Sequence, residues 1–517
     1  MRQTISPFMQ KFIKFFFIFM LLSVSVSLCA QDVPGIRDTI HSTALNETRD
    51  FHIVLPDDYK AGSRKRYDVL YVLDAEDDGH KITDIVHTEQ GYGFLPSMII
   101  VHILTIYWHD RDRDFTPSHI DSLPSSGGAS RFLQFMQNEL IPYITRKYPV
   151  SGYNTLYGHS LGGLFAWYSL LNAPDLFRSY IITDPSLWWD NGYMEQVIAK
   201  KLPNPLLNEK KLYIGSRDGE GMKDMHTDHM DTLLRRFAPG GLRWRSVHYP
   251  DETHFSLFYK TAWDGLKFTY RGYTGGFDLQ PVSGTFVKGQ PFRIFSYNPE
   301  MEGTVLRYTT DGSQPGITSP VMHQNITVNA PIIKIRAFAE RPQYDTTIAL
   351  QFTEGQPIIP LERPAEVEAG GFNYSYYEGT WDKLPDFAGL QPKLMGMAGK
   401  SFRVGYNVAK FPDANHFALL EEGYIEIKQS GYYTFSLNSD DGSRLYIGNK
   451  LIIDYDGLHA RWASKTCMVS LQKGFYPLRL EYFQNQYDLF LELKYMPPGY
   501  STLMMIPYDQ QFHRIKQ

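Results

Sequence analysis

The stretch Gly158-His159-Ser160-Leu161-Gly162 decides how this chain is expected to fold and to work. It follows an apolar run at residues 153–157 and precedes a helix-like run at residues 163–171. A strand, a sharp turn around a serine and then a helix form the context of a nucleophile elbow. At the start of that helix, the N–H group of Leu161 and the helix dipole would stabilise a developing oxyanion. We therefore predict that Ser160 is a catalytic nucleophile on a strained turn.

The composition is that of a large globular protein. The chain has 517 residues, of which 43% are hydrophobic and 15% aromatic, enough for about three domains with well-filled cores. The net charge of -5 gives no indication of a nucleic-acid partner.

The first 30 residues have the pattern of an export signal. Basic residues precede an apolar run at residues 15–28, which is short for a membrane span. We predict cleavage after Ala30, with a lipidated Cys29 as the alternative. The mature chain would keep only Cys467 and so form no internal disulfide. We expect an exported protein without a stable membrane span, located in a bacterial periplasm, at the outer cell surface or in the medium.

Alternating strand-like and helix-like segments predict an α/β domain over residues 31–273. The apolar runs at residues 67–73 and 98–107 are expected to be strands buried on both faces, and apolar spacing predicts a helix over residues 131–148. Further strands are expected at residues 50–55, 179–183, 211–215 and 243–249, and further helices near residues 224–237 and 256–269. This order is typical of a mostly parallel sheet with helices on both faces.

The remaining sequence is expected to be all-β. Short alternating segments and turn residues predict a small β-sandwich over residues 277–353. Residues 354–364 are predicted to be a linker, and residues 365–517 a β-barrel or sandwich.

A serine nucleophile needs a base and an acid. His254 lies between the last expected strand and the last expected helix, where the histidine of this arrangement belongs, so we predict that it is the base. The acid, which would orient the imidazole and stabilise the imidazolium, is expected in the loop after residues 211–215. Asp218 is our first choice there and Glu220 the second, while Asp184 after the preceding strand is a third candidate.

Other residues at the same expected edge of the sheet are candidates for binding. The N–H group of Ala75 is the candidate second oxyanion donor. Trp188 and Trp189 would form either an aromatic substrate wall or buried packing. Arg113 would either bind an anionic substrate group or form a structural salt bridge. We expect neither a metal nor a cofactor for catalysis.

Residues 40–270 resemble the esterase-D-like esterases, which include enterochelin-type siderophore esterases and feruloyl or acetyl-xylan esterases. The matching stretches are residues 72–74, 113–117, 157–163, 184–190 and 252–254. The resemblance implies an α/β-hydrolase with Ser160 as nucleophile and His254 as base, and Asp218 matches the loop of the family's acid. The family often has glycine where this chain has Ala75.

Two β modules are also similar to known families. Residues 305–315 resemble the β-sandwich at the C-terminus of bacterial chitobiases and hexosaminidases, which usually accompanies glycan-active enzymes. Residues 370–500 resemble the protective-antigen-type (PA14-like) module. Some of its carbohydrate-binding members hold a calcium ion on paired aspartates, which makes Asp440 and Asp441 candidate calcium and glycan ligands. A plain Asp-Gly hairpin turn is the alternative.

These observations predict an exported serine esterase that acts through an acyl-enzyme and carries two β modules. The modules favour acetyl or feruloyl decorations on glycans as substrates. A siderophore esterase is the first alternative, favoured by the tryptophan pair and Arg113. A glycan-binding protein with a vestigial esterase domain is the second. The sequence does not specify the acyl group or the oligomeric state.

Overall fold

The computed structural model describes residues 34–105, 108–297, 302–397, 415–461, 463–485 and 488–515. The predicted signal segment at residues 1–30 lies outside this part of the chain. The chain divides into two compact units, an N-terminal unit that ends at Tyr270 and a C-terminal unit that begins at Arg271. Among the described residues, no helix has both the length and the apolar character that a bilayer crossing requires.

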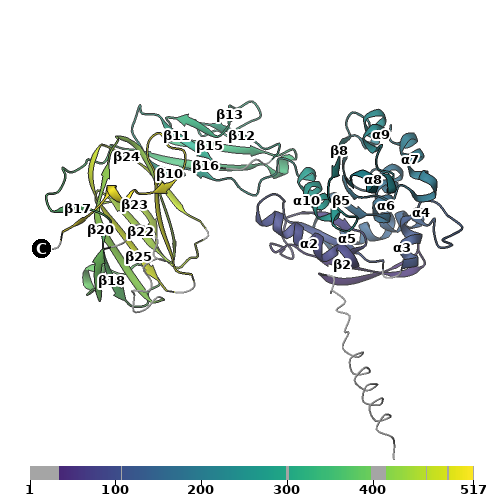
Figure 1. The fold of residues 1–517 in the computed structure, drawn as a ribbon, viewed down its shortest axis with the longest axis horizontal. Helices are drawn as coiled ribbons and strands as arrows, with labels where there is room; N and C mark the ends of the chain where they lie inside the picture. Colours follow the sequence, from purple (N-terminus) through teal and green to yellow (C-terminus); the bar gives the residue numbers. More distant parts are fainter. Residues whose placement is uncertain are drawn as a thin grey trace, which may run out of the picture. The chain divides into compact units, whose positions relative to one another are not determined.

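An eight-stranded sheet with the order β1-β2-β4-β3-β5-β6-β7-β8 forms the centre of the N-terminal unit (Figure 1). Strands β4, β3, β5, β6, β7 and β8 are parallel, while β2, near one edge, pairs antiparallel with both β4 and β1. The strands are β1 (Ile36–Ser42), β2 (Glu47–Val54), β3 (Tyr67–Val72), β4 (Met98–Ile103), β5 (Val150–His159), β6 (Ser179–Thr183), β7 (Lys211–Arg217) and β8 (Arg243–Tyr249). Every residue of β3 and β4 is buried, as their continuous apolar runs predict.

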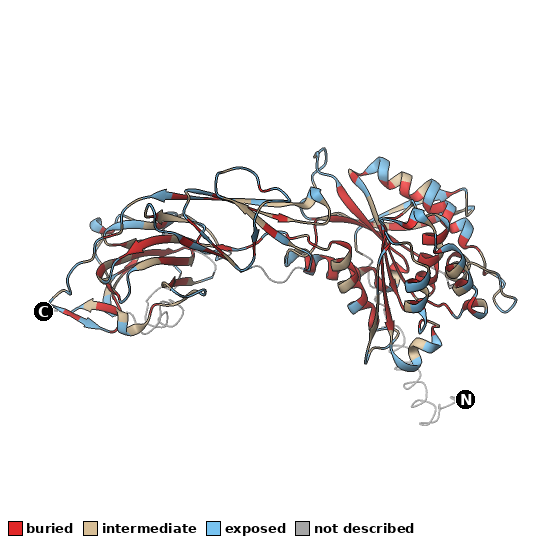
Figure 2. Cartoon of the chain, turned by 90° about the horizontal axis from the view of Figure 1, so that it is seen from above, coloured by how far each residue is buried: buried red, intermediate tan, exposed pale blue. Residues whose placement is uncertain are grey.

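Helices cover both faces of this sheet (Figures 1 and 2). One group contains α2 and α10, and another contains α6 with α3, α4 and α7. The helices are α2 (Ala75–Gly91), α3 (Trp108–Phe115), α4 (Ala129–Phe135), α5 (Ile141–Lys147), α6 (Leu161–Asn172), α7 (Trp189–Lys201), α8 (Gly219–Asp224), α9 (Met230–Phe237) and α10 (Leu257–Thr269). A π-helical turn at Met136–Leu140 separates α4 from α5, where one helix was expected. The predicted α/β class is confirmed.

The parallel strands place the loops of interest at one edge of the sheet. Parallel strands end at the same edge, which is where open α/β sheets bind ligands. Asp74 follows β3, Ser160 follows β5, Asp184 follows β6 and Asp218 follows β7, while His254 lies between β8 and α10.

The C-terminal unit consists of β-sheets, as predicted. The sheet orders are β13-β12-β15-β16-β10-β24-β21-β26-β27, β17-β28-β20-β25-β22-β23 and β14-β11-β9, and β18 and β19 pair beside β20. The strands are β9 (Leu279–Gln280), β10 (Ser283–Phe286), β11 (Phe292–Ser296), β12 (Val305–Thr309), β13 (Val321–Met322), β14 (Asn325–Val328), β15 (Ile332–Phe338), β16 (Thr346–Glu354), β17 (Val367–Ala369), β18 (Asn373–Glu378), β19 (Leu394–Met397), β20 (Phe417–Ile427), β21 (Gly431–Asp440), β22 (Ser443–Ile447), β23 (Lys450–Tyr455), β24 (Lys465–Leu471), β25 (Gly474–Gln484), β26 (Phe490–Met496), β27 (Met504–Met505) and β28 (Gln511–Arg514).

One sheet runs through both β-rich segments of this unit. Strand β10 pairs in parallel with β16 on one side and with β24 on the other. Met468 of β24 belongs to the buried cluster that Phe286 and Phe292 help to form. The backbone N–H of Val287 also donates to the hydroxyl of Tyr432 at 2.9 Å. The two segments therefore share hydrogen bonds and part of a core.

Candidate active site

Ser160 occupies the turn between β5 and α6. Its φ of 58° and ψ of -117° are strained for a residue with a side chain. Its N–H group donates to the carbonyl oxygen of Thr183 at 3.0 Å. A Cβ atom on Gly158 would lie 2.3 Å from the carbonyl oxygen of Gly162, so the turn requires glycine there. The geometry is that of the predicted nucleophile elbow.

The loop after β6 packs against this turn. The N–H group of Ser186 donates to the carbonyl oxygen of Ser160 at 3.1 Å. The two serine hydroxyl oxygens are 3.2 Å apart, within hydrogen-bond distance. Asp184, in the same loop, has a φ of 41° and is fully buried. Its carboxylate therefore lies in a segment that is hydrogen-bonded directly to the serine.

His254 contacts this carboxylate. Its Nδ1 lies 2.7 Å from Oδ2 of Asp184, and the histidine side chain keeps 23% exposure while the aspartate has 0%. Our preference for Asp218, followed by Glu220, is therefore wrong. The carboxylate that meets the histidine is Asp184, the third candidate.

The end of β7, after which the acid was expected, contributes a cation to the site. Strand β7 extends two residues further than predicted, from Gly215 to Arg217. The Nε of Arg217 donates to Oδ2 of Asp184 at 2.7 Å. Asp218 and Glu220 follow at the start of α8 and are exposed. The side chain that β7 contributes to the site is thus a guanidinium that holds the acid, a role that sequence reasoning missed.

These contacts set the ionisation of Asp184. Burial raises the pKa of its carboxyl, but hydrogen bonds from His254 and Arg217 and the charge of Arg217 outweigh burial and hold the pKa below its ordinary value. An ionised Asp184 accepts the Nδ1 proton of His254, which leaves Nε2 as the basic nitrogen.

A second histidine and aspartate, His159 and Asp78, lie beside His254. The rings of His159 and His254 have centroids 4.5 Å apart, and Nδ1 of His159 lies 3.5 Å from Oδ2 of Asp78. Burial raises the pKa of Asp78, but His159, and after it Lys81, outweigh burial and hold the pKa below its ordinary value. The residue before the nucleophile therefore restricts the ring of the base. Nothing in the sequence distinguished these two residues.

Two helix N-termini meet beside Ser160. Leu161 and Ala75 are the first residues of α6 and α2, and such N–H groups have no acceptor within their own helix. A Cβ on Gly162 would lie 3.4 Å from Oδ2 of Asp74, so the two helix ends are close. The guanidinium of Arg111 binds both oxygens of Asp74 at 2.9 Å. The arrangement suits an oxyanion hole.

The remaining candidates have different surroundings. Trp188 is 43% exposed, whereas Trp189 is 1% exposed and packs in the core, so only Trp188 is available to a substrate. Arg113 donates to Asp114 at 2.7 Å and to Glu47 at 2.6 Å. Arg113 is therefore a structural ion-pair residue, which corrects its assignment as a substrate ligand. One of its carboxylate partners, Glu47, lies on β2, and the other two, Asp110 and Asp114, lie on α3 itself.

A serine on a strained turn, a histidine bound to a buried aspartate and this strand order together define an α/β-hydrolase. Residues 42–233 match the sequence family described as "Putative esterase". The chain is also 31% identical to the ferri-bacillibactin esterase BesA of Bacillus subtilis over 249 residues, which cover 44% of this chain and 86% of that protein. The chain belongs to this esterase family, and it is a carboxylic ester hydrolase.

Other matches extend this comparison. A siderophore enterobactin esterase of Emericella nidulans is 40% identical over 86 residues, which are 16% of this chain and 28% of that protein. The crystal structure of an IroE-like serine hydrolase from Shewanella oneidensis is 30% identical, with a TM-score of 0.42, and the match covers 45% of this chain and 79% of that one. In the C-terminal unit, residues 298–351 match the family "Fn3 associated" and residues 402–505 match the PA14 domain.

Proposed function

We propose that this protein is an exported serine esterase that opens ester bonds of siderophores. The observation that carries the mechanism is the buried contact between Asp184 and His254 beside the strained Ser160. The sequence likeness to a ferri-bacillibactin esterase, which spans 86% of that protein, supports this substrate class. The basic and apolar pattern of the first 30 residues supports export.

The proposed reaction uses the geometry of the elbow. His254 Nε2 takes the proton of the Ser160 hydroxyl while the serine oxygen attacks the ester carbonyl. The N–H groups of Leu161 and Ala75 bind the oxyanion that forms. His254 then gives its proton to the leaving alcohol, and water hydrolyses the acyl-enzyme by the same steps. Asp184 remains ionised and stabilises the imidazolium throughout.

Acyl decorations on glycans are the second candidate substrate. The PA14 match and the resemblance of residues 305–315 to a module of glycan-active enzymes favour it. In this version the C-terminal unit binds a glycan, and the N-terminal unit removes acetyl or feruloyl groups from it.

A panel of four substrates tests both versions: p-nitrophenyl acetate, methyl ferulate, acetylated xylan and a ferric catecholate trilactone. Ser160→Ala is expected to lower kcat by about 10⁴-fold or more. Unchanged turnover in this variant would disprove the Ser160 mechanism. The highest kcat/KM on the trilactone supports the siderophore substrate, whereas the highest value on xylan or ferulate transfers the proposal to glycan decorations.

Calcium in the C-terminal unit is a further part of the proposal, and the residues fit this ion. Asp440 and Asp441 are both buried, and within the described residues Oδ1 of Asp440 has no hydrogen-bond partner. Burial, and then the charges of Asp441 and Asp488, raise the pKa of Asp440 to about 6. A hard divalent cation would relieve this repulsion. Asp440 and Asp441 would hold the ion, which would contact sugar hydroxyls.

A further inference from the structure

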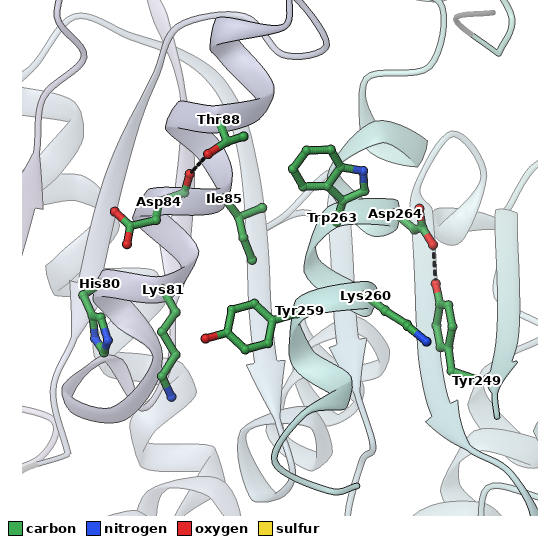
Figure 3. A pocket seen from close by; sticks show the side chains of 10 residues that line it. All are labelled: His80, Lys81, Asp84, Ile85, Thr88, Tyr249, Tyr259, Lys260, Trp263 and Asp264. Carbon is green, nitrogen blue, oxygen red and sulfur yellow. Dashed lines mark hydrogen bonds between the residues drawn. The ribbon is translucent and has the colours of Figure 1, made fainter. Parts of the chain in front are cut away.

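A groove lies between α2 and α10 on one face of the N-terminal unit (Figure 3). The cavity to which it belongs has a volume of about 810 Å³ and is also lined by His80, Tyr249, Lys260 and Asp264. This volume is in the range of small-molecule sites. We call the groove the α2–α10 groove and define it by Lys81, Asp84, Ile85 and Thr88 from α2 and by Tyr259 and Trp263 from α10.

The α10 wall of the groove is aromatic. Figure 3 shows Tyr259 and Trp263 pointing from α10 toward α2, and their spacing of four residues places them on one helix face. Tyr259 is 51% exposed although it is a large aromatic residue, while Ile85 opposite is buried. Trp263 is half-buried and packs against Phe94. One exposed and one half-buried ring over an apolar base favour a flat ring as ligand.

The α2 wall carries an ammonium group and a carboxylate. The lining also includes two charged residues of α10: Lys260, which pairs with Glu252, and Asp264, which accepts a hydrogen bond from the hydroxyl of Tyr249. Lys81 Nζ lies 3.3 Å from Oδ1 of Asp78, and the ammonium group also lies 4.8 Å from the ring centroid of Phe258. Asp84 is exposed one turn further along α2. Figure 3 shows the Asp84 carboxylate pointing away from Tyr259 and Trp263, so Lys81 is the charged side chain of α2 nearer the rings. An ammonium donor beside an aromatic face matches the oxygen of a phenol, which accepts hydrogen bonds.

A short series of contacts connects the groove to the catalytic base. Lys81 contacts Asp78, Asp78 pairs with His159, and the ring of His159 lies against that of His254. Lys81 also lies six residues after Ala75, the first residue of α2, which is roughly 9 Å along the helix axis. The end of the groove at Lys81 is thus linked to the catalytic histidine by three successive side-chain contacts.

We propose that the α2–α10 groove binds a phenolic ring of the ester substrate. The ring stacks on Tyr259 and Trp263, and a hydroxyl group accepts a hydrogen bond from Lys81. This inference rests on the proposed function, since the same ring chemistry occurs in the catechol arms of siderophores and in feruloyl groups.

Binding is measured first, on the full chain with Ser160→Ala so that no turnover occurs. Isothermal titration with 2,3-dihydroxybenzoate and with ferulate is expected to give binding that Tyr259→Ala weakens roughly threefold to tenfold. The matched control is Tyr92→Ala, an exposed tyrosine at the end of α2 outside the groove, which should leave the Kd unchanged. Tighter binding of the first ligand identifies a siderophore arm, and tighter binding of ferulate identifies a feruloyl group. Absence of binding, or equal binding by Tyr259→Ala, overturns the proposal.

Kinetics then separate this inference from the proposed function. In the chain with Ser160 intact, Tyr259→Ala should raise KM for methyl ferulate or the catecholate trilactone, with kcat unchanged, and leave both constants for triacetin unchanged. An equal rise in KM for triacetin, which has no ring, contradicts a phenol site. A chain that binds phenols at the groove but hydrolyses none of these esters would refute the proposed function and leave the groove assignment intact.

Discussion

Two buried aspartates, one in each unit, have carboxyl pKa values shifted in opposite directions. Burial opposes ionisation of both. At Asp184 the hydrogen bonds and charges of His254 and Arg217 outweigh burial and lower the pKa. At Asp440 the neighbouring carboxylates of Asp441 and Asp488 act with burial and raise the pKa to about 6. A buried carboxylate with cations supplied by the fold is already ionised for catalysis, whereas one surrounded by carboxylates requires a proton or an added cation.

The largest expected effect comes from removing the charge of Asp184. Asp184→Asn keeps the size of the side chain but cannot stabilise the imidazolium of His254. We expect kcat/KM for p-nitrophenyl acetate to fall by about 10³-fold to 10⁴-fold near neutral pH.

The matched control is Asp218→Asn, because Asp218 is exposed at the start of α8. Its kcat/KM should stay within about twofold of the wild type. A larger loss at Asp218 than at Asp184 would restore Asp218 as the acid. The lowered pKa of Asp184 would then have no catalytic role in the comparison with Asp440.

A smaller effect is expected from Arg217→Met, which removes the guanidinium that donates to Oδ2 of Asp184 and leaves the contact with His254. We expect kcat/KM to fall roughly 10-fold to 100-fold. The pKa of Asp184 should rise without the guanidinium. As the pH is lowered, the activity and stability that depend on ionised Asp184 should therefore be lost at a higher pH than in the wild type. The measurements are pH profiles of kcat/KM and of unfolding by urea.

Arg217→Lys should restore part of the activity and move the acid limb back toward that of the wild type, because a cation is present again. If the acid limb of the kcat/KM profile of Arg217→Met lies at the same pH as that of the wild type, Arg217 does not set the charge of Asp184.

The smallest expected effect concerns Asp440. Its folded-state pKa of about 6 lies above the ordinary value of 3.8, so its protonation stabilises the fold below pH 3.8 and that contribution is lost as the pH rises through about 6. In EDTA, the Tm of the transition of the C-terminal unit should therefore rise by about 2–5 °C between neutral and mildly acidic pH. Asp440→Asn should remove this rise.

Calcium added at neutral pH should replace the proton and raise the same Tm, and Asp440→Asn should abolish that response as well. The transition of the N-terminal unit serves as the internal control, since Asp184 already has its cations. A calcium response that persists in Asp440→Asn would place the ion elsewhere.

The nucleophile and the base were predictable because local rules place them. A serine between glycines after an apolar strand has few alternatives to an elbow. The order of catalytic residues along the chain places the base in the loop between the last strand and the last helix. The sheet was equally predictable, because fully buried strands such as β3 and β6 need continuous apolar sequence.

The acid was not predictable, because two neighbouring loops both contain carboxylates. The choice depends on the φ of 41° at Asp184 and on the two extra residues of β7 that bring Arg217 to the site. For Arg113 the sequence left both a substrate contact and a salt bridge open, because one of its partners, Glu47, is 66 residues away in sequence. Such pairings depend on tertiary structure and leave no local pattern.

The pairing of β10 with β24 has a consequence for proteolysis. The connecting segment at residues 356–364 contains exposed positions such as Ile359 and Leu361, which a protease can reach. Cleavage there would give two polypeptides that remain associated, because β10 of the first lies beside β24 of the second and Met468 is embedded in the other's core. The chain would therefore migrate as two bands in a denaturing gel, one of which includes the N-terminal unit, and still elute as one species in native chromatography.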